Sequence, residues 1–411
     1  MEDARISDRR ADGVRRMDGD TVGTRLRRWR IRRGLTQRTL ADLAGFSQGY
    51  VAQIEAGLAP LERRAPREAL ARALQISVDE LTGHPDPAAP HQPVDRQAMA
   101  LLRAGIAAVS FPDVAAPGGD PAPGRVDSAW LDRLFDECRY DVLVPALGGA
   151  LTALAVRSRT VTDDERLDHL RQLVEVCSIT VSACVQLGHQ DLTLSVAETA
   201  MRTARELGDP ATLGLANYAR IRALTGTEGA GRAVAEGIDR LSPHIGVDLD
   251  AASVYGMHHL VSAILAAEAG HGATAMGHLD EAARAAGLTG ERPRDWFGFG
   301  PTNVGIWRVA VLVVLGDGPA VRAPVPGFRV EALPVAHRQA TYFIDLSRAL
   351  LQCRGADSAA AAALHRAEVI APQLVGTSEG AREAVGTLLR RPRFGRDARL
   401  RGFARRVGLP D

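Results

Sequence analysis

The segment QRTLADLAGFSQGYVAQIEA, residues 37–56, decides the fold of the N-terminal part of the chain. Thr36 is placed to cap a helix over residues 37–44. Gly45 can adopt the left-handed conformation that ends a helix at little cost. Ser47 can then cap a second helix. Two short helices joined by such a tight turn form a helix-turn-helix unit.

The apolar pattern of this unit predicts its core. Ala41 is small where the second helix has to cross the first. At helical spacing, the other positions predicted to face the shared core are Leu40, Leu43, Val51, Ile54 and Leu58.

The flanking sequence predicts three further helices. Residues 23–36 place Leu26 and Trp29 inward and arginines outward, residues 66–76 continue the pattern, and a short helix follows over residues 77–81. Five helices between residues 23 and 82 make a compact domain.

The charge of the chain is unevenly distributed. Residues 23–74 contain eleven arginines and four acids, which gives +7, whereas the 411 residues together carry +1, so the remainder sums to −6. A basic N-terminal module on a mildly acidic body indicates a polyanionic partner at one end of the protein.

The N-terminal segment RLRRWRIRRGLTQRTLADLAGFSQGYVAQIEAG resembles the lambda-repressor-like, Xre-type helix-turn-helix domain of bacterial transcriptional regulators. The resemblance covers residues 23–82, where the blocks GLTQ, LA, QIEAG and ISVDEL occur in order. It implies that the second helix of the unit is the recognition helix, which enters the major groove of DNA.

The resemblance also implies roles for single residues. Gln48 and Gln53, about one turn apart on the outward face, would read base edges, because glutamine can pair bidentately with adenine. Arg30 and Glu55 match an internal ion pair of the family. The residues implied to contact phosphate are Gln37, Arg38, Ser47, Tyr50, Arg63 and Arg64.

The sequence departs from the family pattern at several positions. Ala52 replaces a usual serine, Gly49 offers no side chain beside Gln48, and the loop at residues 58–66 is about one residue longer than usual. Tyr50 suits packing against the preceding helix nearly as well as a DNA contact. The alternative for the whole unit is a helical bundle that serves only packing or protein contacts.

Composition and spacing divide the rest of the chain. Residues 1–22 are charge-dense and predict a disordered arm, and residues 83–93 predict a proline-rich linker. Residues 94–411 predict a helical regulatory and dimerisation domain, with an isolated helix near 94–110 followed by a loop at 111–125. The chain is 46% hydrophobic but only 4% aromatic, which is typical of an all-α protein.

A recurring element organises the region after residue 128. A long helix ends in glycine, and a second, alanine-rich helix starts a few residues later. The turn glycines, 38 to 46 residues apart, are Gly188, Gly226, Gly270, Gly316 and Gly355. This pattern predicts an α-solenoid of helical hairpins and resembles degenerate tetratricopeptide repeats. A lambda-repressor-like head on such a body resembles regulators of Gram-positive bacteria, some of which sense peptides and others small metabolites.

The segment RPRDWFGFGPTNVGIW, residues 292–307, concentrates aromatic side chains in a chain that has few of them. Either it forms an effector-binding lip or a dimer contact, or its rings fill the space between two repeats; the second interpretation is favoured. The residues concerned are Arg294, Trp296, Phe297, Phe299, Asn303 and Trp307.

The sequence gives little support for nucleotide binding, metal binding, disulfides or catalysis. Residues 298–305 lack the preceding strand and the Lys-Ser/Thr of a phosphate loop. The histidines between 258 and 278 show no metal-ligand spacing and are expected on helix surfaces. The four cysteines show no CxxC spacing and are expected to be core thiols. We expect no enzyme, no cofactor and no metal. With neither a signal peptide nor an 18-residue apolar run, we expect a cytoplasmic, nucleoid-associated protein.

The leading hypothesis is a transcriptional regulator that binds double-stranded DNA as a homodimer on a pseudo-palindromic operator and responds to a peptide or small-molecule effector. The rival hypothesis is a peptide-binding scaffold of the tetratricopeptide type without direct DNA readout. The sequence leaves open whether the protein activates or represses.

Overall fold

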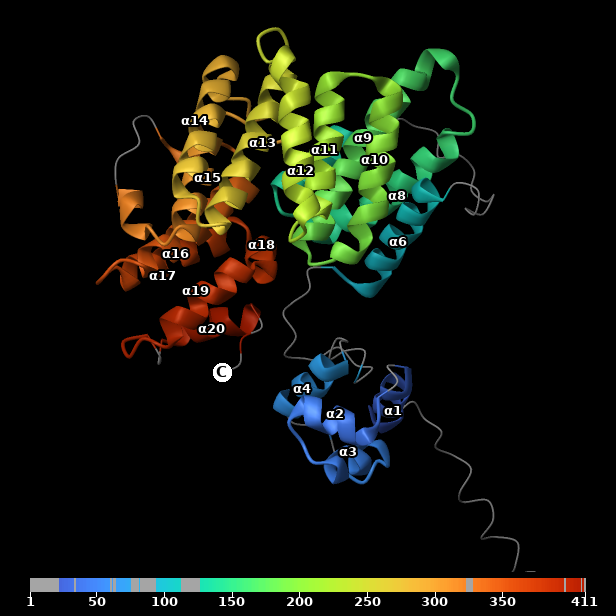
Figure 1. The fold of residues 1–411 in the computed structure, drawn as a ribbon, viewed down its shortest axis with the longest axis vertical. Coiled ribbons are helices and arrows are strands. Elements are labelled where there is room, and N and C mark those ends of the chain that lie inside the picture. The colour runs from blue at the N-terminus through green and yellow to red at the C-terminus, as the bar shows by residue number, and fades with distance from the viewer. Residues whose placement is uncertain are drawn as a thin grey trace, which may run out of the picture. The chain divides into compact units, whose positions relative to one another are not determined.

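A computed structural model of the chain describes residues 22–32, 35–59, 61, 64–74, 81, 94–111, 126–322, 328–394, 397–407 and 409. In these ranges the protein is helical and contains no strand (Figure 1). One isolated bridge joins Arg292 to Phe299. The chain divides into two compact units, residues 1–89 and 90–411. We call their described parts the head and the body. Residues 1–21 of the predicted arm (1–22), the linker at 83–93 and residues 77–80 of the predicted helix at 77–81 lie outside the described residues.

The head contains four described helices. They are α1 (Val22–Arg32), α2 (Gln37–Ala44), α3 (Gln48–Glu55) and α4 (Arg64–Leu74). α1 begins at Val22, which is the last residue of the predicted arm (1–22). The caps are those that the sequence indicates. Thr36 Oγ1 accepts a hydrogen bond from Thr39 N at 3.0 Å, and Ser47 Oγ accepts one from Tyr50 N at 3.3 Å.

One apolar cluster joins the helices of the head. Its fully buried members include Leu26, Leu40, Val51, Leu70, Leu74 and Leu81. The turn between α2 and α3 depends on Gly45, whose φ of +75° is in the left-handed region. At Gly23, where α1 crosses α3, a Cβ would lie only 2.2 Å from the carbonyl oxygen of Ile54. Glycine is therefore required there for close packing, which the sequence did not reveal.

Two predicted core positions in the head are wrong. Leu43 is 61% exposed and Leu58 is 79% exposed. The buried face of α2 runs through Leu40 and Ala41, and Leu43 lies about a third of a turn to one side of it. α3 ends at Glu55, so helical spacing no longer applies at Leu58.

The body begins with α6 (Arg96–Ser110), which packs against α8 (Tyr140–Arg157). The predicted isolation of this helix is therefore wrong. A Cβ on Gly105 would lie 2.5 Å from the carbonyl oxygen of Gly148, so the two helices approach closely only because both residues are glycines.

By length and composition, α8 could also cross a membrane, although no 18-residue apolar run was expected. Its Leu143, Val144, Leu147 and Leu151 are completely buried in the core of the body. This burial is the pattern of a core helix.

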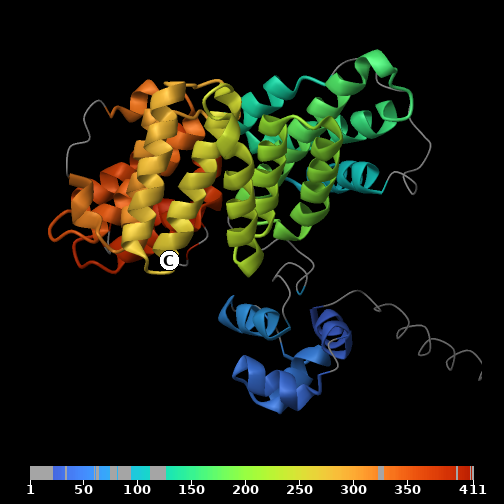
Figure 2. The same cartoon turned by 45° about the horizontal axis from the view of Figure 1, so that its top comes forward.

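Helical hairpins make up most of the body (Figures 1 and 2). Three pairs follow one another and pack together: α9 with α10, α11 with α12, and α13 with α14. Their bounds are α9 (Asp163–Gln186), α10 (Thr193–Leu207), α11 (Pro210–Ala223), α12 (Glu228–Leu241), α13 (Leu249–Glu268) and α14 (Gly272–Thr289). A short helix, α7 (Ser128–Asp136), packs on α8 and α9.

The C-terminal part of the body is less regular. It contains α15 (Pro301–Val314), α16 (Ala336–Leu351), α17 (Asp357–Ile370), α18 (Pro372–Thr377), α19 (Glu379–Leu389) and α20 (Ala398–Arg406). Short 3₁₀ turns occur at Gln190–Leu192, Ser242–His244, Gly318–Arg322 and Val330–Ala332. The helix expected after Gly316 is one of these turns, so this predicted hairpin is not formed as a helix pair.

The five predicted turn glycines all have left-handed backbones. Their φ values are +80°, +82°, +76°, +74° and +71° for Gly188, Gly226, Gly270, Gly316 and Gly355. Each of these residues follows directly or closely after the end of a long helix. The recurring glycine therefore marks real helix ends, as its conformational freedom predicts.

The four cysteines and two neighbouring histidines are buried in the body. Cys138, Cys177, Cys184 and Cys353 are buried free thiols. His258 and His259 were expected on a helix surface, but they are 0% and 5% exposed. His258 Nδ1 donates to Val254 O at 2.8 Å and His258 Nε2 accepts from Asn217 Nδ2 at 3.1 Å, so hydrogen bonds compensate for the burial of the ring.

Candidate nucleic-acid interface

The exposed face of α3 is the centre of the candidate interface. Val51 and Ile54 are buried, which turns the opposite side of the helix to solvent. At 3.6 residues per turn, Gly49 lies in the middle of that exposed side, with Ala52 and Gln53 about 50° to either side of the middle. Gln48 and Gln53, both exposed, lie on opposite sides of Gly49 and Ala52, about 140° apart around the axis, and not one turn apart as expected.

The middle of this face is open. A Cβ built on Gly49 would have no atom within 4 Å apart from its chain neighbours and the backbone of its own helix. A helix with glycine and alanine in the middle of its outer face can lie close to a flat surface, while longer side chains reach out on both sides. Such a shape suits the floor of a major groove, which is about 12 Å wide.

The other predicted contact residues surround α3. Arg38 and Ser47 are exposed. Tyr50 is half-buried, and its ring centroid lies 5.3 Å from that of Phe46, so the tyrosine is partly engaged in packing. Arg64 begins α4, and Arg63 lies outside the described residues.

An internal ion pair fixes α1 against α3. Arg30 Nε donates to Glu55 Oε1 at 2.6 Å and Arg30 Nη2 donates to Glu55 Oε2 at 2.9 Å. The side chains are only 13% and 3% exposed, so this is a buried bidentate pair. Burial raises the pKa of Glu55, but hydrogen bonds from Arg30 and Gln37 outweigh it and keep the net pKa below its ordinary value.

Gln37 takes part in this network. Its Nε2 donates to Glu55 Oε2 at 2.9 Å. One amide proton is therefore committed inside the head, and the side chain is half-buried. Because Thr39 N is bonded to the Thr36 cap, the backbone N–H groups at the start of α2 that could face an anion are those of Gln37 and Arg38. The sequence did not reveal this link between α2 and α3.

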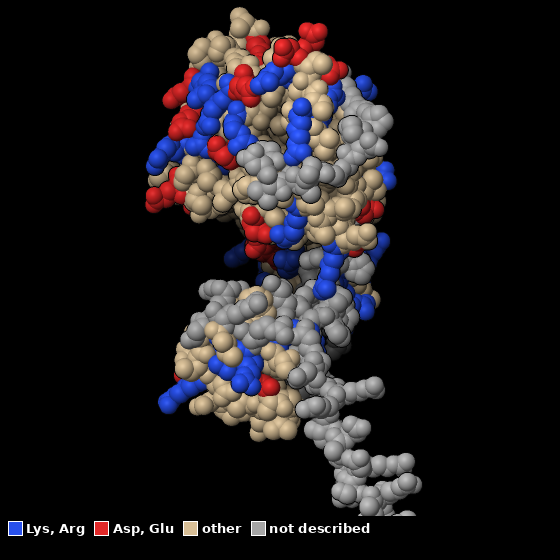
Figure 3. All heavy atoms as spheres, turned by 90° about the vertical axis from the view of Figure 1, so that its right-hand side faces the viewer, with Lys and Arg blue, Asp and Glu red and all other residues tan. Residues whose placement is uncertain are grey.

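Charge agrees with an anionic partner for the head. On the face shown in Figure 3, the charged side chains visible on the head are mostly basic, whereas acidic and basic side chains are mixed on the body. Arg27, Arg38 and Arg72 are exposed in the head. A surface of this kind attracts phosphates without regard to sequence.

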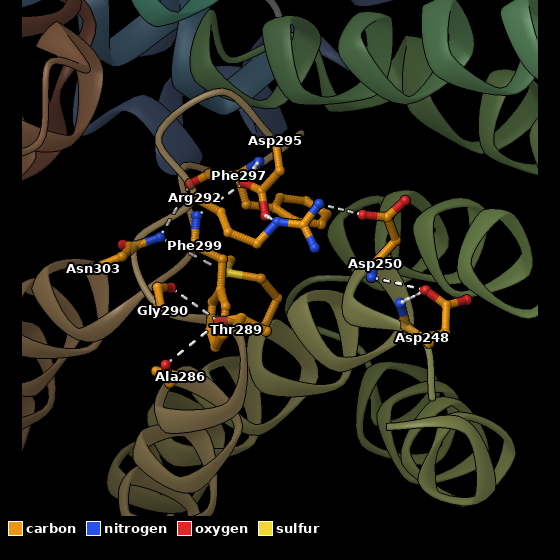
Figure 4. A network of polar contacts seen from close by, with 12 residues as sticks. Asp248, Asp250, Ala286, Thr289, Gly290, Arg292, Asp295, Phe297, Phe299 and Asn303 are labelled. Atoms are coloured by element: carbon orange, nitrogen blue, oxygen red, sulfur yellow. Dashed lines mark hydrogen bonds and ion pairs between the residues drawn. The ribbon is translucent and has the colours of Figure 1, made fainter. Parts of the chain in front are cut away.

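The aromatic segment of the body divides into two parts. Phe299 and Asn303 are completely buried, and Asn303 Nδ2 donates to Phe297 O at 3.0 Å (Figure 4). Arg294, Trp296 and Phe297 line a cavity. Trp307 is half-buried, with the Arg338 guanidinium 5.9 Å from its ring centroid. The segment thus both fills space and borders a hollow.

Comparison with known proteins agrees with the geometry of the head. A family model described as a helix-turn-helix domain matches residues 21–82. No curated protein and no solved structure matches the chain. The head is therefore a helix-turn-helix domain, which supports DNA binding in general and a regulator in preference to an enzyme.

Proposed function

We propose that the protein is a sequence-specific transcriptional regulator of the Xre type that binds double-stranded DNA in the cytoplasm. The observation that carries this proposal is the outer face of α3, with two exposed glutamines on either side of Gly49 and Ala52. Glutamine can distinguish adenine from other bases in the major groove. Exposed arginines of the head would supply the contacts to phosphate.

The proposed regulator acts as a homodimer on a pseudo-palindromic operator. One head reads too few base pairs for useful specificity, so two heads on half-sites about one helical turn apart are expected. The body would supply dimerisation and the effector site as a solenoid of the tetratricopeptide type. Its succession of hairpins, each with a left-handed glycine at the turn between its two helices, supports this arrangement.

Footprinting with the full-length protein tests the proposal. On the upstream region of its own gene, the protein is expected to protect two stretches with related sequences at physiological salt. Sedimentation of the complex should give two chains per operator. If no stretch is protected and the body instead captures a peptide, the protein is a scaffold and the regulator proposal is wrong.

Replacing Gln48 by alanine tests base readout. We expect binding to the operator to weaken by about 1–3 kcal/mol, or roughly fivefold to 150-fold, because one bidentate base contact is lost. Binding to a scrambled duplex should not change, since Gln48 is not needed for phosphate contacts. The measurement is a titration of both duplexes at one salt concentration.

The matched control is Gln97→Ala, which removes an exposed glutamine from α6 in the body. This variant should bind both duplexes as the original protein does. If Gln48→Ala lowers the affinity for the operator and for the scrambled duplex by the same factor, Gln48 does not have the assigned role in base readout.

A further inference from the structure

The body contains a partly open cavity of about 240 Å³. It is bordered by α7, α9, α11, the segment at 294–297 and the first turn of α16. Sites for drug-sized ligands usually measure about 300–1,000 Å³, so this cavity suits a smaller molecule. Its walls combine acidic, basic and aromatic side chains.

The first wall is acidic. Asp132 and Asp136 come from α7 and Glu175 from α9. Ser128 Oγ donates to Glu175 Oε2 at 2.6 Å, whereas within the described part of the chain no hydrogen bond or ion pair engages the carboxyls of Asp132 and Asp136. Burial, together with the charges of Asp136, Asp295 and Glu175, raises the pKa of Asp132 to about 8.

The neighbouring carboxyl is also perturbed. Burial raises the pKa of Asp136 to about 7, although the nearby Arg338 acts in the opposite direction. Arg133, which is not in the cavity wall, acts in the opposite direction on Asp132. The raised pKa values mean that the two carboxyls hold their negative charge poorly without a cation close to them.

The second wall is basic. Arg222 from α11, Arg294 and Arg338 from α16 line the cavity, and His337 lies beside them. Arg222 Nε is buried without a hydrogen-bond partner. Burial and the charges of Arg338 and Arg222 lower the pKa of His337 well below its ordinary value, so its imidazole stays neutral. In the described ranges, no carboxylate lies within 4.0 Å of these three arginines.

The third kind of lining is aromatic. Phe135 packs against His337 with ring centroids 4.9 Å apart, and Tyr218 packs against Phe297 at 4.7 Å. Trp296 completes this part of the lining. The segment that carries Trp296 and Phe297 is held by Asp295 Oδ1, which accepts hydrogen bonds from Phe297 N (3.1 Å) and Phe299 N (2.9 Å) (Figure 4). These rings are preformed contact surfaces for an apolar group.

Buried charged groups are costly unless they are paired and hydrogen-bonded. Here carboxyls and guanidiniums border the same hollow but do not pair across it. A ligand with one cationic and one anionic group would satisfy both walls at once. A purely anionic ligand would leave Asp132 and Asp136 without a partner. A purely cationic ligand would leave Arg222 without one.

We propose that this cavity binds a small zwitterion, an amino acid or an amino-acid-like metabolite. Its ammonium group lies at Asp132, Asp136 and Glu175, its carboxylate lies at Arg222 and Arg338, and its body contacts the aromatic rings. This inference rests on the effector half of the proposed function and names its ligand class. Because the cavity joins α7, α11 and α16, a bound ligand links segments far apart in the sequence and can favour one arrangement of the body.

Calorimetry with the full-length protein, in the absence of DNA, tests the proposal. The probes are the standard amino acids, β-alanine and γ-aminobutyrate at millimolar concentration. At least one should bind. Analogues of the best binder that lack either the amino group or the carboxylate should bind at least about tenfold more weakly, since hydrogen bonds to charged groups contribute about 1.5–3 kcal/mol.

Two variants should separate the walls. Asp132→Asn should weaken binding of the zwitterion and of the amine analogue, but not of the acid analogue. Arg222→Gln should weaken binding of the zwitterion and of the acid analogue, but not of the amine analogue. The matched controls on α12, Asp239→Asn and Arg232→Gln, change exposed residues outside the cavity and should bind as the original protein does. If Asp132→Asn does not fold, Asp136→Asn serves the same comparison.

The proposal is overturned if no probe binds, or if the amine or acid analogue binds as tightly as the zwitterion. It is also overturned if the cavity variants behave like the controls. Because ligand binding is measured without DNA and footprinting without ligand, the two proposals can fail separately. Loss of the footprint with ligand binding intact rejects DNA readout alone, and the opposite result rejects the zwitterion site alone.

Discussion

Replacing Glu55 by alanine is expected to unfold a large fraction of the head. Glu55 accepts hydrogen bonds from Arg30 at 2.6 and 2.9 Å and from Gln37 at 2.9 Å, with its side chain only 3% exposed. Removing one partner of a buried pair costs about 3–5 kcal/mol, because the other charge stays buried without compensation. A domain below about 80 residues rarely has more than about 3–5 kcal/mol of stability.

Native-state hydrogen exchange of the full-length protein measures this effect. In Glu55→Ala, peptides from α1, α2 and α3 should lose their protection, while peptides from the body keep theirs. Operator binding should fall in proportion to the folded fraction of the head. The control Asp42→Ala removes an exposed acidic residue of α2 and should leave protection unchanged.

A double substitution separates the ion pair from simple packing. Arg30→Leu together with Glu55→Leu removes both charges, so no charge is left buried alone. The double variant should be more stable than either single variant. If the loss of stability in the double variant equals the sum of the losses in the two single variants, Arg30 and Glu55 do not act as a pair. Our explanation of the α1–α3 contact is then wrong.

The helix-turn-helix unit could be predicted from the sequence because its determinants are local. Thr36, Gly45 and Ser47 each act within three or four residues, through a cap or a left-handed turn. The same holds for the body, where Gly188 and its counterparts set the helix ends. Local signals did not predict the burial of side chains where it depends on packing between helices, as for the exposed Leu43 and the buried His258.

The cavity in the body could not be predicted, because its walls come from distant segments. Asp132, Glu175, Arg222 and Arg338 are separated by tens of residues and show no motif in the sequence. From the sequence, each of these residues is indistinguishable from other charged residues on a helix. Only the aromatic content of residues 292–307 pointed to this region, and it did not distinguish Phe297, at the cavity, from Phe299, in the core.

Phe299 anchors the segment that borders the cavity, and Phe299→Ala is expected to destabilise the body by about 3–5 kcal/mol. The ring is completely buried. It packs directly on Gly256 in α13, where a Cβ would lie 2.1 Å from Phe299 Cζ. Thermal unfolding of the full-length protein measures the loss, and Phe111→Ala, which truncates a 58% exposed ring, should have little effect.

Gly256 provides the sharper test, because the sign of its effect should reverse. Alanine is more favourable than glycine within a helix by about 1 kcal/mol. In the original protein, Gly256→Ala should nevertheless destabilise, since its Cβ collides with the ring of Phe299. In the Phe299→Ala background the ring is absent, so Gly256→Ala should stabilise. If the substitution has the same sign in both backgrounds, Phe299 does not press on Gly256, and the segment at 292–300 is anchored by its polar contacts alone.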